Sequence, residues 1–176
     1  LTVNPVGNNL RVTDDANNVA GTTLTPEPYF MNVKANFFRD QINPGYALSV
    51  GSYVYSSSYE IVAGWPSLAL YPGRPLSANF TNINLYRNGP NATLKFAAAV
   101  NAINDRSIKV SIYNTVVDTE SMPLFSYLKK TITNIPLSAF LDLSNLQITF
   151  ENTSAVVLDR FVLAYDEITY PSTFNF

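Results

Sequence analysis

The stretch SLALYPGRPLSANFTNINLYRNGPNATLKFAAAV, residues 67–100, decides the fold predicted for this chain of 176 residues. Three strands are predicted within it, over residues 67–71, 76–86 and 92–100. Two turn signals, Pro72-Gly73 and Asn88-Gly89, separate them, because proline presets φ at one turn position and glycine supplies the positive φ of another. Neither alternating face of residues 76–86 is wholly apolar, which indicates a sheet with one face in water.

Short strands of alternating polarity continue on both sides of this stretch. Strands are predicted over residues 29–38, 46–55 with 59–62, 108–117, 124–135, 146–150 and 156–170. Residues 136–144 follow the start signal of a proline and have apolar residues at helical spacing, so they are the predicted helix. About nine or ten strands with almost no helix predict an all-β fold, a single Ig-like or jelly-roll β-sandwich.

Two further predictions concern which aromatic and aliphatic residues are buried. In the strand at residues 29–38, Met31, Val33, Ala35 and Phe37 share one face, which we predict to lie in the core. Trp65 is predicted to plug one end of the sandwich, since aromatic side chains tend to bury their large area.

Composition excludes several kinds of chemistry. The chain is 47% hydrophobic, but only 14% charged with a net charge of −2, where an ordinary domain has about 25% charged residues. It has no basic stripe for a phosphate backbone, so no nucleic-acid partner is expected. Cysteine and histidine are absent, which removes thiolate metal sites and the usual nucleophile–base pairs. We therefore expect no cofactor, no metal site and no enzymatic activity, although a glycosidase with a carboxylate pair stays open.

The start of the chain and its longest apolar run bear on location. The chain begins at Leu1 without an initiator Met, as a cleaved signal peptide or a processed tag would leave it. Its longest apolar run, residues 96–100, is far shorter than the roughly 18 residues of a transmembrane segment. We expect an extracellular protein at the cell surface, without a transmembrane segment.

The order of elements in residues 67–100 carries a resemblance. An apolar strand, a Pro-Gly turn, a strand ending in Asn, an Asn-Gly turn and a further strand follow one another. This order resembles the Ig-like sandwich of prokaryotic cell-surface and fibre subunits. It is similar in particular to the camelysin/TasA-type biofilm fibre proteins and to the archaeal thread and bundling-pilus subunits. The resemblance implies a structural subunit of an extracellular filament.

Two regions are predicted, an N-terminal tail over residues 1–28 and the β-sandwich domain over residues 29–176. In the tail, Leu1 and Val3 share one strand parity, as do Leu10 and Val12. We expect these four residues to insert as a donor strand into the sheet of a neighbouring copy, where main-chain hydrogen bonds give affinity and alternate side chains set the register. The leading hypothesis is therefore a homopolymer that serves adhesion, biofilm formation or cell–cell contact.

Candidate modification and metal sites are few. Three sequons, at Asn79, Asn91 and Asn152, are candidate N-glycosylation sites if the chain is secreted, so N-linked glycans are expected partners. Chance alone predicts about three sequons at this content of Asn, Ser and Thr, so their number is not informative. Residues 14–18 carry oxygen ligands of the kind that calcium prefers, but without the spacing of a calcium loop, and a solvated turn is the favoured interpretation.

The end of the chain supports an alternative function. VVLDRFVLAYDEITY, residues 156–170, resembles the last strand of jelly-roll carbohydrate-binding modules. In that interpretation Asp159 and Arg160 form a structural pair, and exposed aromatic residues elsewhere stack on sugar. The alternative is therefore a secreted carbohydrate-binding module of the jelly-roll type.

Overall fold

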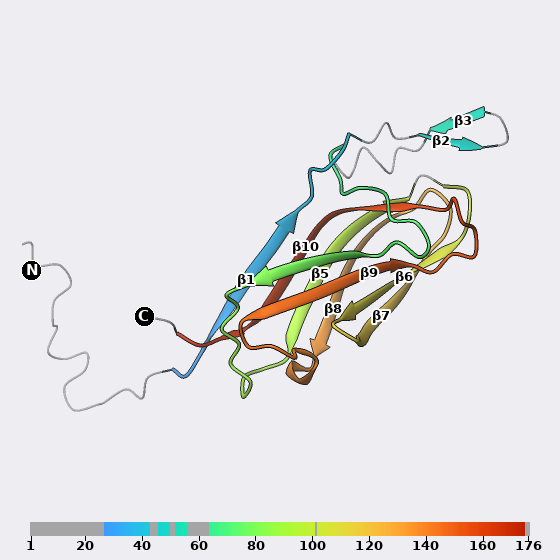
Figure 1. The fold of residues 1–176 in the computed structure, drawn as a ribbon. Coiled ribbons are helices and arrows are strands. Elements are labelled where there is room, and N and C mark those ends of the chain that lie inside the picture. The colour runs from blue at the N-terminus through green and yellow to red at the C-terminus, as the bar shows by residue number, and fades with distance from the viewer. Residues whose placement is uncertain (1–26, 43–45, 50–51, 56–63, 101, 175–176) are drawn as a thin grey trace, which may run out of the picture.

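The computed structural model describes residues 27–42, 46–49, 52–55, 64–100 and 102–174 (Figure 1). Its strands are β1 (Phe30–Phe37), β2 (Tyr46–Ser49), β3 (Ser52–Tyr55), β4 (Leu76–Thr81), β5 (Ala92–Val100), β6 (Arg106–Ile112), β7 (Thr115–Met122), β8 (Tyr127–Ile135), β9 (Asn145–Asn152) and β10 (Phe161–Ser172). A single-turn 3-10 helix, η1 (Leu137–Ala139), precedes β9. The prediction of an all-β chain is therefore confirmed for the described residues.

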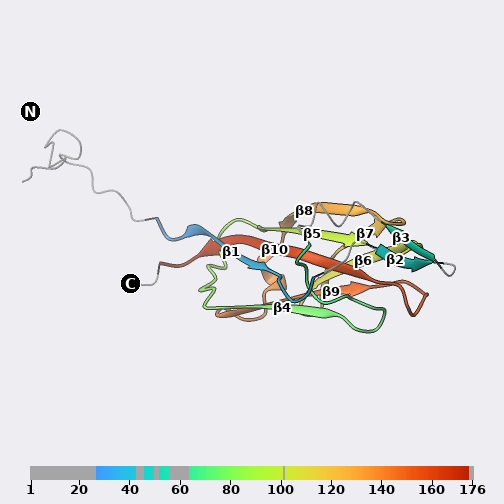
Figure 2. The same cartoon turned by 90° about the horizontal axis from the view of Figure 1, so that it is seen from above.

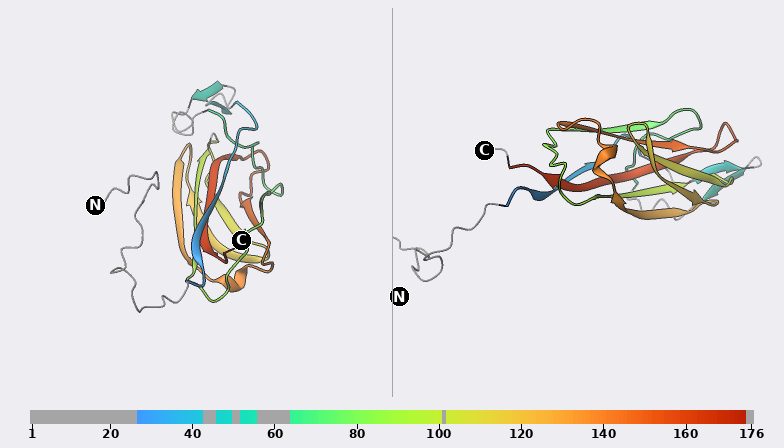
Figure 3. Two further views of the ribbon diagram at one scale, coloured as in Figure 1. Left: turned by 90° about the vertical axis from the view of Figure 1, so that its left-hand side faces the viewer. Right: turned by 90° about the horizontal axis from the view of Figure 1, so that it is seen from below.

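Two antiparallel sheets lie face to face in the described chain (Figure 2, Figure 3). One has the strand order β1-β10-β5-β8 and the other β4-β9-β6-β7, while β2 and β3 form a separate hairpin. From β4 to β10 the chain changes sheet at every step except between β6 and β7. This alternation between two four-stranded sheets is that of a jelly roll, which decides between the two predicted kinds of sandwich.

The core lies between the inner faces of the two sheets. Along β5 the inward residues include Leu94, Phe96 and Val100, and along β9 they include Ile148 and Phe150, all fully buried. The rings of Phe96 and Phe150 meet across the sheets with their centroids 5.3 Å apart and nearly edge to face. Each such side chain contributes about 1.5–3 kcal/mol by leaving water, so these two central strands hold the sandwich together.

Of the three strands predicted within residues 67–100, the structure forms one in full and one in part. Its third predicted strand is β5, residue for residue. Its second predicted strand ends early, because Asn82 and Asn84 adopt left-handed φ values of 55° and 47°, which a strand cannot continue through. Its first predicted strand is wrong, since residues 67–71 form no more than an isolated bridge between Leu70 and Phe161.

The glycines of the two predicted turns, Gly73 and Gly89, have different structural roles. Gly73 has a φ of 74°, as the turn signal predicts. Gly89 has no positive φ, and a Cβ on it would lie 2.5 Å from the Cβ of Pro171. The glycine after Asn88 is therefore required for the close approach of this turn to β10, and not for its φ.

The predicted core face of β1 is wrong, because the strand faces the other way. Met31, Val33, Ala35 and Phe37 are exposed, and Phe37 keeps 67% of its surface accessible. On the inward face Asn32 and Asn36 meet polar groups that β10 buries. Asn32 donates to the Tyr170 hydroxyl, and Asn36 donates to the Asp166 carboxylate. Two buried polar groups on β10 need partners, and this need decides which face of β1 points inward.

Other boundaries differ from the predictions in ways that turns explain. The predicted strand at residues 108–117 is the hairpin of β6 and β7, since Tyr113 has a φ of 49° and reverses the chain. The predicted helix at residues 136–144 is reduced to η1. Trp65 is 53% exposed, so it does not plug the end of the sandwich.

The predicted donor strand, with Leu1, Val3, Leu10 and Val12, lies outside the described residues, as does the Asp14–Asn18 turn. Within the described part, no helix has the length and apolar character that crossing a bilayer requires. The assignment of residues 1–28 to a separate tail stays a prediction.

Candidate functional site

A polar hollow of about 330 Å³ lies on the outer face of the sheet β4-β9-β6-β7. Its lining residues come from β4, β9, the β6–β7 turn and the loop before β9: Asn79, Phe80, Thr81, Tyr113, Asp142, Asn145, Leu146 and Gln147. They meet because β4 and β9 pair antiparallel, with Asn79 opposite Gln147 and Thr81 opposite Asn145. The hollow therefore gathers side chains from four separate segments at one end of the sandwich.

The outer face of this sheet is polar because each strand alternates. On β4 and β9 the even positions Ala78, Phe80, Leu146 and Ile148 are buried, which leaves the odd positions to face water. Those outward positions bond one another across the strands. Gln147 Nε2 donates to Asn79 Oδ1 over 3.3 Å, so the two amides hold each other in place.

Tyr113 is held rigidly at the rim in a conformation that tyrosine seldom adopts. It stands at the β6–β7 turn with a left-handed φ of 49°. Its N–H donates to the Gln147 carbonyl over 3.1 Å, and its hydroxyl donates to the Asn145 carbonyl over 2.6 Å. A non-glycine residue in this region costs on the order of 1–3 kcal/mol, and such strain is found where geometry serves function.

The charge in the hollow belongs to Asp142. Its carboxylate accepts hydrogen bonds of 2.7 Å from Asn145 Nδ2 and from the Ser144 N–H. These hydrogen bonds lower the pKa of Asp142, that from Asn145 most. Burial, and then the Asp142 charge, raise the pKa of the Tyr113 phenol. Near neutral pH the hollow therefore presents an ionised carboxylate beside a neutral phenol.

These groups can bind hydroxyl-rich ligands but do not form a hydrolytic pair. Asn and Gln amides donate and accept, the carboxylate accepts, and a phenol ring offers an apolar face. Among the described residues that line the hollow, Asp142 is the one carboxylate, whereas a glycosidase uses two. No group of acidic residues in the described chain is arranged to hold a metal ion.

A second hollow, of about 520 Å³, lies at the opposite end of the sandwich. It is lined by Gln41, Leu68, Ala69, Leu70, Tyr71, Arg74, Pro75 and Leu76. Five of these eight residues are aliphatic or proline, and its polar side chains are Gln41, Tyr71 and Arg74.

The three sequons have different surroundings. Asn79 lines the polar hollow and is exposed, and Asn91 is exposed just before β5. Asn152 is 2% exposed, and its side-chain nitrogen donates to the Leu70 carbonyl over 3.2 Å and to Asp159 over 3.1 Å. In the folded chain Asn152 is therefore a buried structural residue with no room for a glycan, whatever the state of Asn79 and Asn91.

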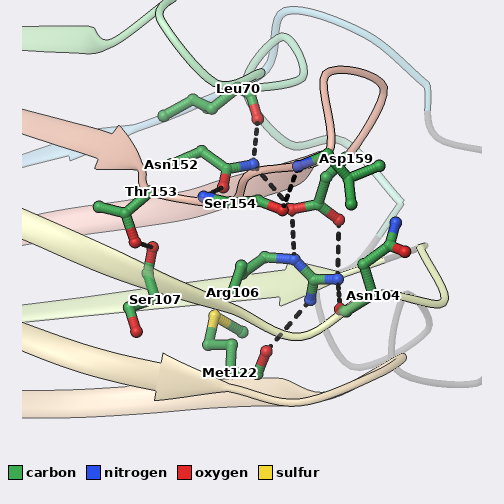
Figure 4. Close-up of polar contacts among 10 residues, drawn as sticks. Leu70, Asn104, Arg106, Ser107, Met122, Asn152, Thr153, Ser154 and Asp159 are labelled. Atoms are coloured by element: carbon green, nitrogen blue, oxygen red, sulfur yellow. Dashed lines mark hydrogen bonds and ion pairs between the residues drawn. The ribbon is translucent and has the colours of Figure 1, made fainter.

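Asp159 belongs to a buried ion pair, but its partner is not the predicted one (Figure 4). Its two carboxylate oxygens accept from Arg106 Nε and Nη2, over 2.7 and 2.8 Å. Arg106 comes from β6 and also donates to the carbonyls of Asn104 and Met122.

Comparison with known proteins shows the fold alone. No family model and no curated protein matches this chain. Dimeric latent PorU from Porphyromonas gingivalis is a solved structure with a similar fold, at a TM-score of 0.58 and 10% identity over 89% of this chain. The chain spans only 14% of the length of that protein. At this identity the similarity establishes the sandwich and nothing about activity.

Two carbohydrate-binding modules are more distantly similar. The CBM36-1 domain of a multidomain xylanase from the hindgut metagenome of Trinervitermes trinervoides matches at a TM-score of 0.49 and 14% identity, over 78% of this chain and 96% of that domain. A CBM36 module solved with calcium and xylotriose matches at 0.48 and 14%, over 77% and 98%. None of these three structures is that of a fibre subunit, so the resemblance to such subunits stays a prediction. The chain is a jelly-roll sandwich that these comparisons place in no family.

Proposed function

We propose that this chain is a secreted carbohydrate-binding module that holds its ligand in the polar hollow beside Tyr113. The observation that carries the proposal is the lining of that hollow, where amide, hydroxyl and carboxylate groups surround a rigidly held phenol ring. Sugars offer hydroxyl groups that both donate and accept, together with an apolar ring face that stacks on aromatic side chains. The ligand class is therefore a hydroxyl-rich oligosaccharide or polysaccharide.

The charge of the hollow restricts the class of ligand further. Asp142 is ionised near neutral pH, because its hydrogen bonds lower its pKa. An anionic sugar would be repelled, whereas a neutral sugar hydroxyl can donate to the carboxylate. The proposed ligand is thus a neutral sugar chain, and the proposal requires that Asn79, which lines the same hollow, carry no glycan.

A Tyr113→Gly variant tests whether sugar affinity can be lost while the sandwich stays folded. Glycine adopts the positive φ of this position without the steric cost that tyrosine pays, about 1–2 kcal/mol. Because the change also removes the packing of the ring against the core and the hydrogen bond of its hydroxyl to the Asn145 carbonyl, we expect the free energy of unfolding to fall by no more than about 2 kcal/mol, while affinity for the sugar falls at least about tenfold. A glycan array identifies the ligand, calorimetric titration measures affinity, and urea denaturation measures stability.

Tyr71→Ala is the matched control, because Tyr71 lines the second hollow at the opposite end of the sandwich. This variant should keep full affinity. The proposal is wrong if the array shows no bound neutral sugar, or if the Tyr113→Gly variant binds as tightly as wild type.

A second candidate function, the filament subunit, is favoured by the edge of β1, where no further strand pairs among the described residues. This strand pairs with β10 over all eight residues without a bulge and contains no proline, and Lys34 is its one charged residue. Edge strands usually carry such interruptions or outward charges to prevent pairing with other chains. The strand β8, at the other edge of the sheet, does carry Lys129 and Lys130, and Lys130 forms ion pairs with Asp118 and Glu120 of β7.

In this second function a neighbour adds a strand at the edge of β1. Both sheets of the jelly roll are complete in the described chain, so a donor segment finds no vacant position between strands. It would instead extend the sheet beyond β1, beside the exposed apolar side chains Met31, Val33 and Phe37. The proposed donor is the N-terminal tail of another copy, with Leu10 and Val12 on one parity.

Charge on the outer face of β1 is expected to block assembly without unfolding the sandwich. In a Val33→Lys variant the added charge is exposed in the monomer but would be buried against the donor segment. Light scattering and negative-stain microscopy should show filaments for wild type and for Thr133→Lys on the exposed face of β8, but monomers for Val33→Lys. In the tail, Leu10→Asp with Val12→Asp should block assembly, and Arg11→Asp on the opposite parity should not. A wild-type chain that stays monomeric on concentration would exclude this function.

A further inference from the structure

The second hollow, of about 520 Å³ at the start of β4, is used by neither proposed function. Much of its lining is apolar: Leu70 is 2% exposed, Leu76 is half-buried, and Leu68 keeps 60% of its surface accessible. Hollows of about 300–1,000 Å³ with mostly apolar linings and a few polar groups are typical of small-molecule sites. The second hollow therefore has the size and the kind of lining that a ligand site requires.

The chain segment that lines this hollow is held firmly against the start of β10. The Leu70 N–H donates to the Phe161 carbonyl over 2.8 Å, and the Phe161 N–H donates to the Leu70 carbonyl over 3.3 Å. The Leu70 carbonyl also accepts from Asn152 Nδ2 over 3.2 Å (Figure 4). Gln41 Nε2 donates to the Ser67 carbonyl over 3.1 Å, which ties a second part of the lining to the same segment. The hollow is therefore formed before a ligand arrives, so binding requires little ordering of the chain.

The Pro72-Gly73 turn brings two hydrogen-bond donors to the hollow. The Arg74 N–H donates to the Tyr71 carbonyl over 3.0 Å, and Gly73 has a φ of 74°, as in a type II turn. The first and last residues of such a turn lie within about 7 Å of each other, so the Tyr71 phenol and the Arg74 guanidinium line the same hollow. Neither side chain forms a hydrogen bond or an ion pair with another described residue. Both are therefore free to donate to a ligand.

We propose that the second hollow binds a small monocarboxylate that carries an apolar chain or ring. Arg74 is the one charged side chain among the eight lining residues, so the hollow attracts an anion. A guanidinium presents its donors as a planar fork that matches the two oxygens of a carboxylate, and the phenol adds a further donor. A single cation matches a monoanion, whereas a phosphate monoester carries nearly two charges near neutral pH. The aliphatic side chains of the lining then cover the apolar body of the ligand.

This carboxylate site is independent of the proposed sugar site. The two hollows share no lining residue, and their charges are opposite, because Asp142 supplies an anion to the polar hollow and Arg74 supplies a cation here. A neutral sugar suits the second hollow less, since its hydroxyl groups would lie against aliphatic side chains. Loss of sugar binding in Tyr113→Gly should leave carboxylate binding unchanged, so the two proposals fail separately.

Calorimetric titration of the full chain with octanoate and with 3-phenylpropionate tests the proposal, for a chain and for a ring respectively. Octanol has the same chain without a charge, and octyltrimethylammonium has the opposite charge, so both should bind at least about tenfold more weakly than octanoate. Arg74→Gln should weaken carboxylate binding by about tenfold or more, because the amide keeps a donor but loses the charge and the fork. Arg87→Gln is the matched control, since this exposed guanidinium donates to the Phe140 carbonyl and does not line the hollow, and it should bind as wild type does.

The apolar contact and the location of the site have separate readouts. Leu68→Ser should weaken octanoate binding about threefold or more, whereas Leu141→Ser, at a position 62% exposed in the loop before β9, should not weaken it. In nuclear magnetic resonance spectra, octanoate should shift the amide signals of the lining residues and leave those of Tyr113 and Gln147 unchanged. The inference is overturned if neither carboxylate binds, if octanol binds as tightly as octanoate, or if Arg74→Gln binds as wild type does. It is also overturned if the shifted signals belong to another surface of the chain.

Discussion

Replacing Arg106 with methionine is expected to lower the free energy of unfolding by about 3–5 kcal/mol. The guanidinium and the Asp159 carboxylate are both fully buried and lie 2.7 Å apart. Methionine keeps most of the apolar stem of arginine but leaves a buried carboxylate without its counter-charge. The Asn152 amide still donates to that carboxylate over 3.1 Å, but a neutral donor cannot replace the lost charge.

Urea denaturation of two further variants isolates the buried charge from the loss of arginine itself. Arg87→Met removes an exposed guanidinium that donates to the Phe140 carbonyl, and it should cost less than about 1 kcal/mol. The double variant Arg106→Met with Asp159→Leu removes both charges and should recover much of the loss, because an apolar pair of similar volume replaces the ion pair. If Arg106→Met costs no more than Arg87→Met, the pair does not stabilise the fold in the way argued.

The strands with a strong local pattern could be predicted from the sequence. Residues 92–100 are almost wholly apolar and are bounded by turn residues, and β5 has these bounds. The sandwich class followed from many such segments in succession, because their number and spacing do not depend on any one boundary. Local sequence patterns were therefore sufficient to predict the fold class.

The orientation of β1 could not be predicted, because its cause lies far along the chain. Its apolar residues share one face, and the local pattern assigns that face to the core. Asn36 instead points inward to Asp166, which is 130 residues further on. A pattern within one strand cannot show which buried polar groups its neighbour will present.

The candidate site could not be predicted from the sequence, for a related reason. Tyr113 fits an alternating strand, and no glycine next to it signals a turn, so its positive φ had no local marker. Asp142 fell in the predicted helix over residues 136–144, and Asn145 lay between that helix and the strand predicted over residues 146–150, so neither was expected to face Gln147. Asp159 was assigned to the adjacent Arg160, although its partner is 53 residues away. Pairings across strands, which depend on register, brought these groups together.

The second large effect concerns Asp166, which is expected to make the fold more stable in mild acid than at neutral pH. This carboxyl is fully buried, and burial raises its pKa from 3.8 to about 7. Asn36 Nδ2 opposes the shift with two long hydrogen bonds of 3.3 and 3.4 Å. Lys34 lies on the same face of β1, but its amine donates to the Thr81 carbonyl and does not pair with the carboxylate.

The sign follows from the protons that each state binds. Between pH 3.8 and about 7 the folded carboxyl holds its proton, whereas the unfolded one has lost it. Stability from this group is therefore fully present below pH 3.8, falls as the pH rises, and is lost above about pH 7. A shift of this size corresponds to a free energy on the order of 4 kcal/mol.

An Asp166→Asn variant should abolish this slope, because the amide keeps the shape of the carboxyl but has no proton to lose. Its free energy of unfolding should exceed that of wild type by a few kcal/mol at about pH 8, and the difference should vanish near pH 4. Urea denaturation of both proteins across this range measures the difference, in which the titration of Asp142 and the other carboxylates cancels. Asp105→Asn at an exposed position should keep the slope of wild type. Parallel curves of the free energy of unfolding against pH for wild type and Asp166→Asn would mean that Asp166 is ionised in the folded chain. A cation would then have to move inward to neutralise it, and Lys34 is the nearest candidate on β1.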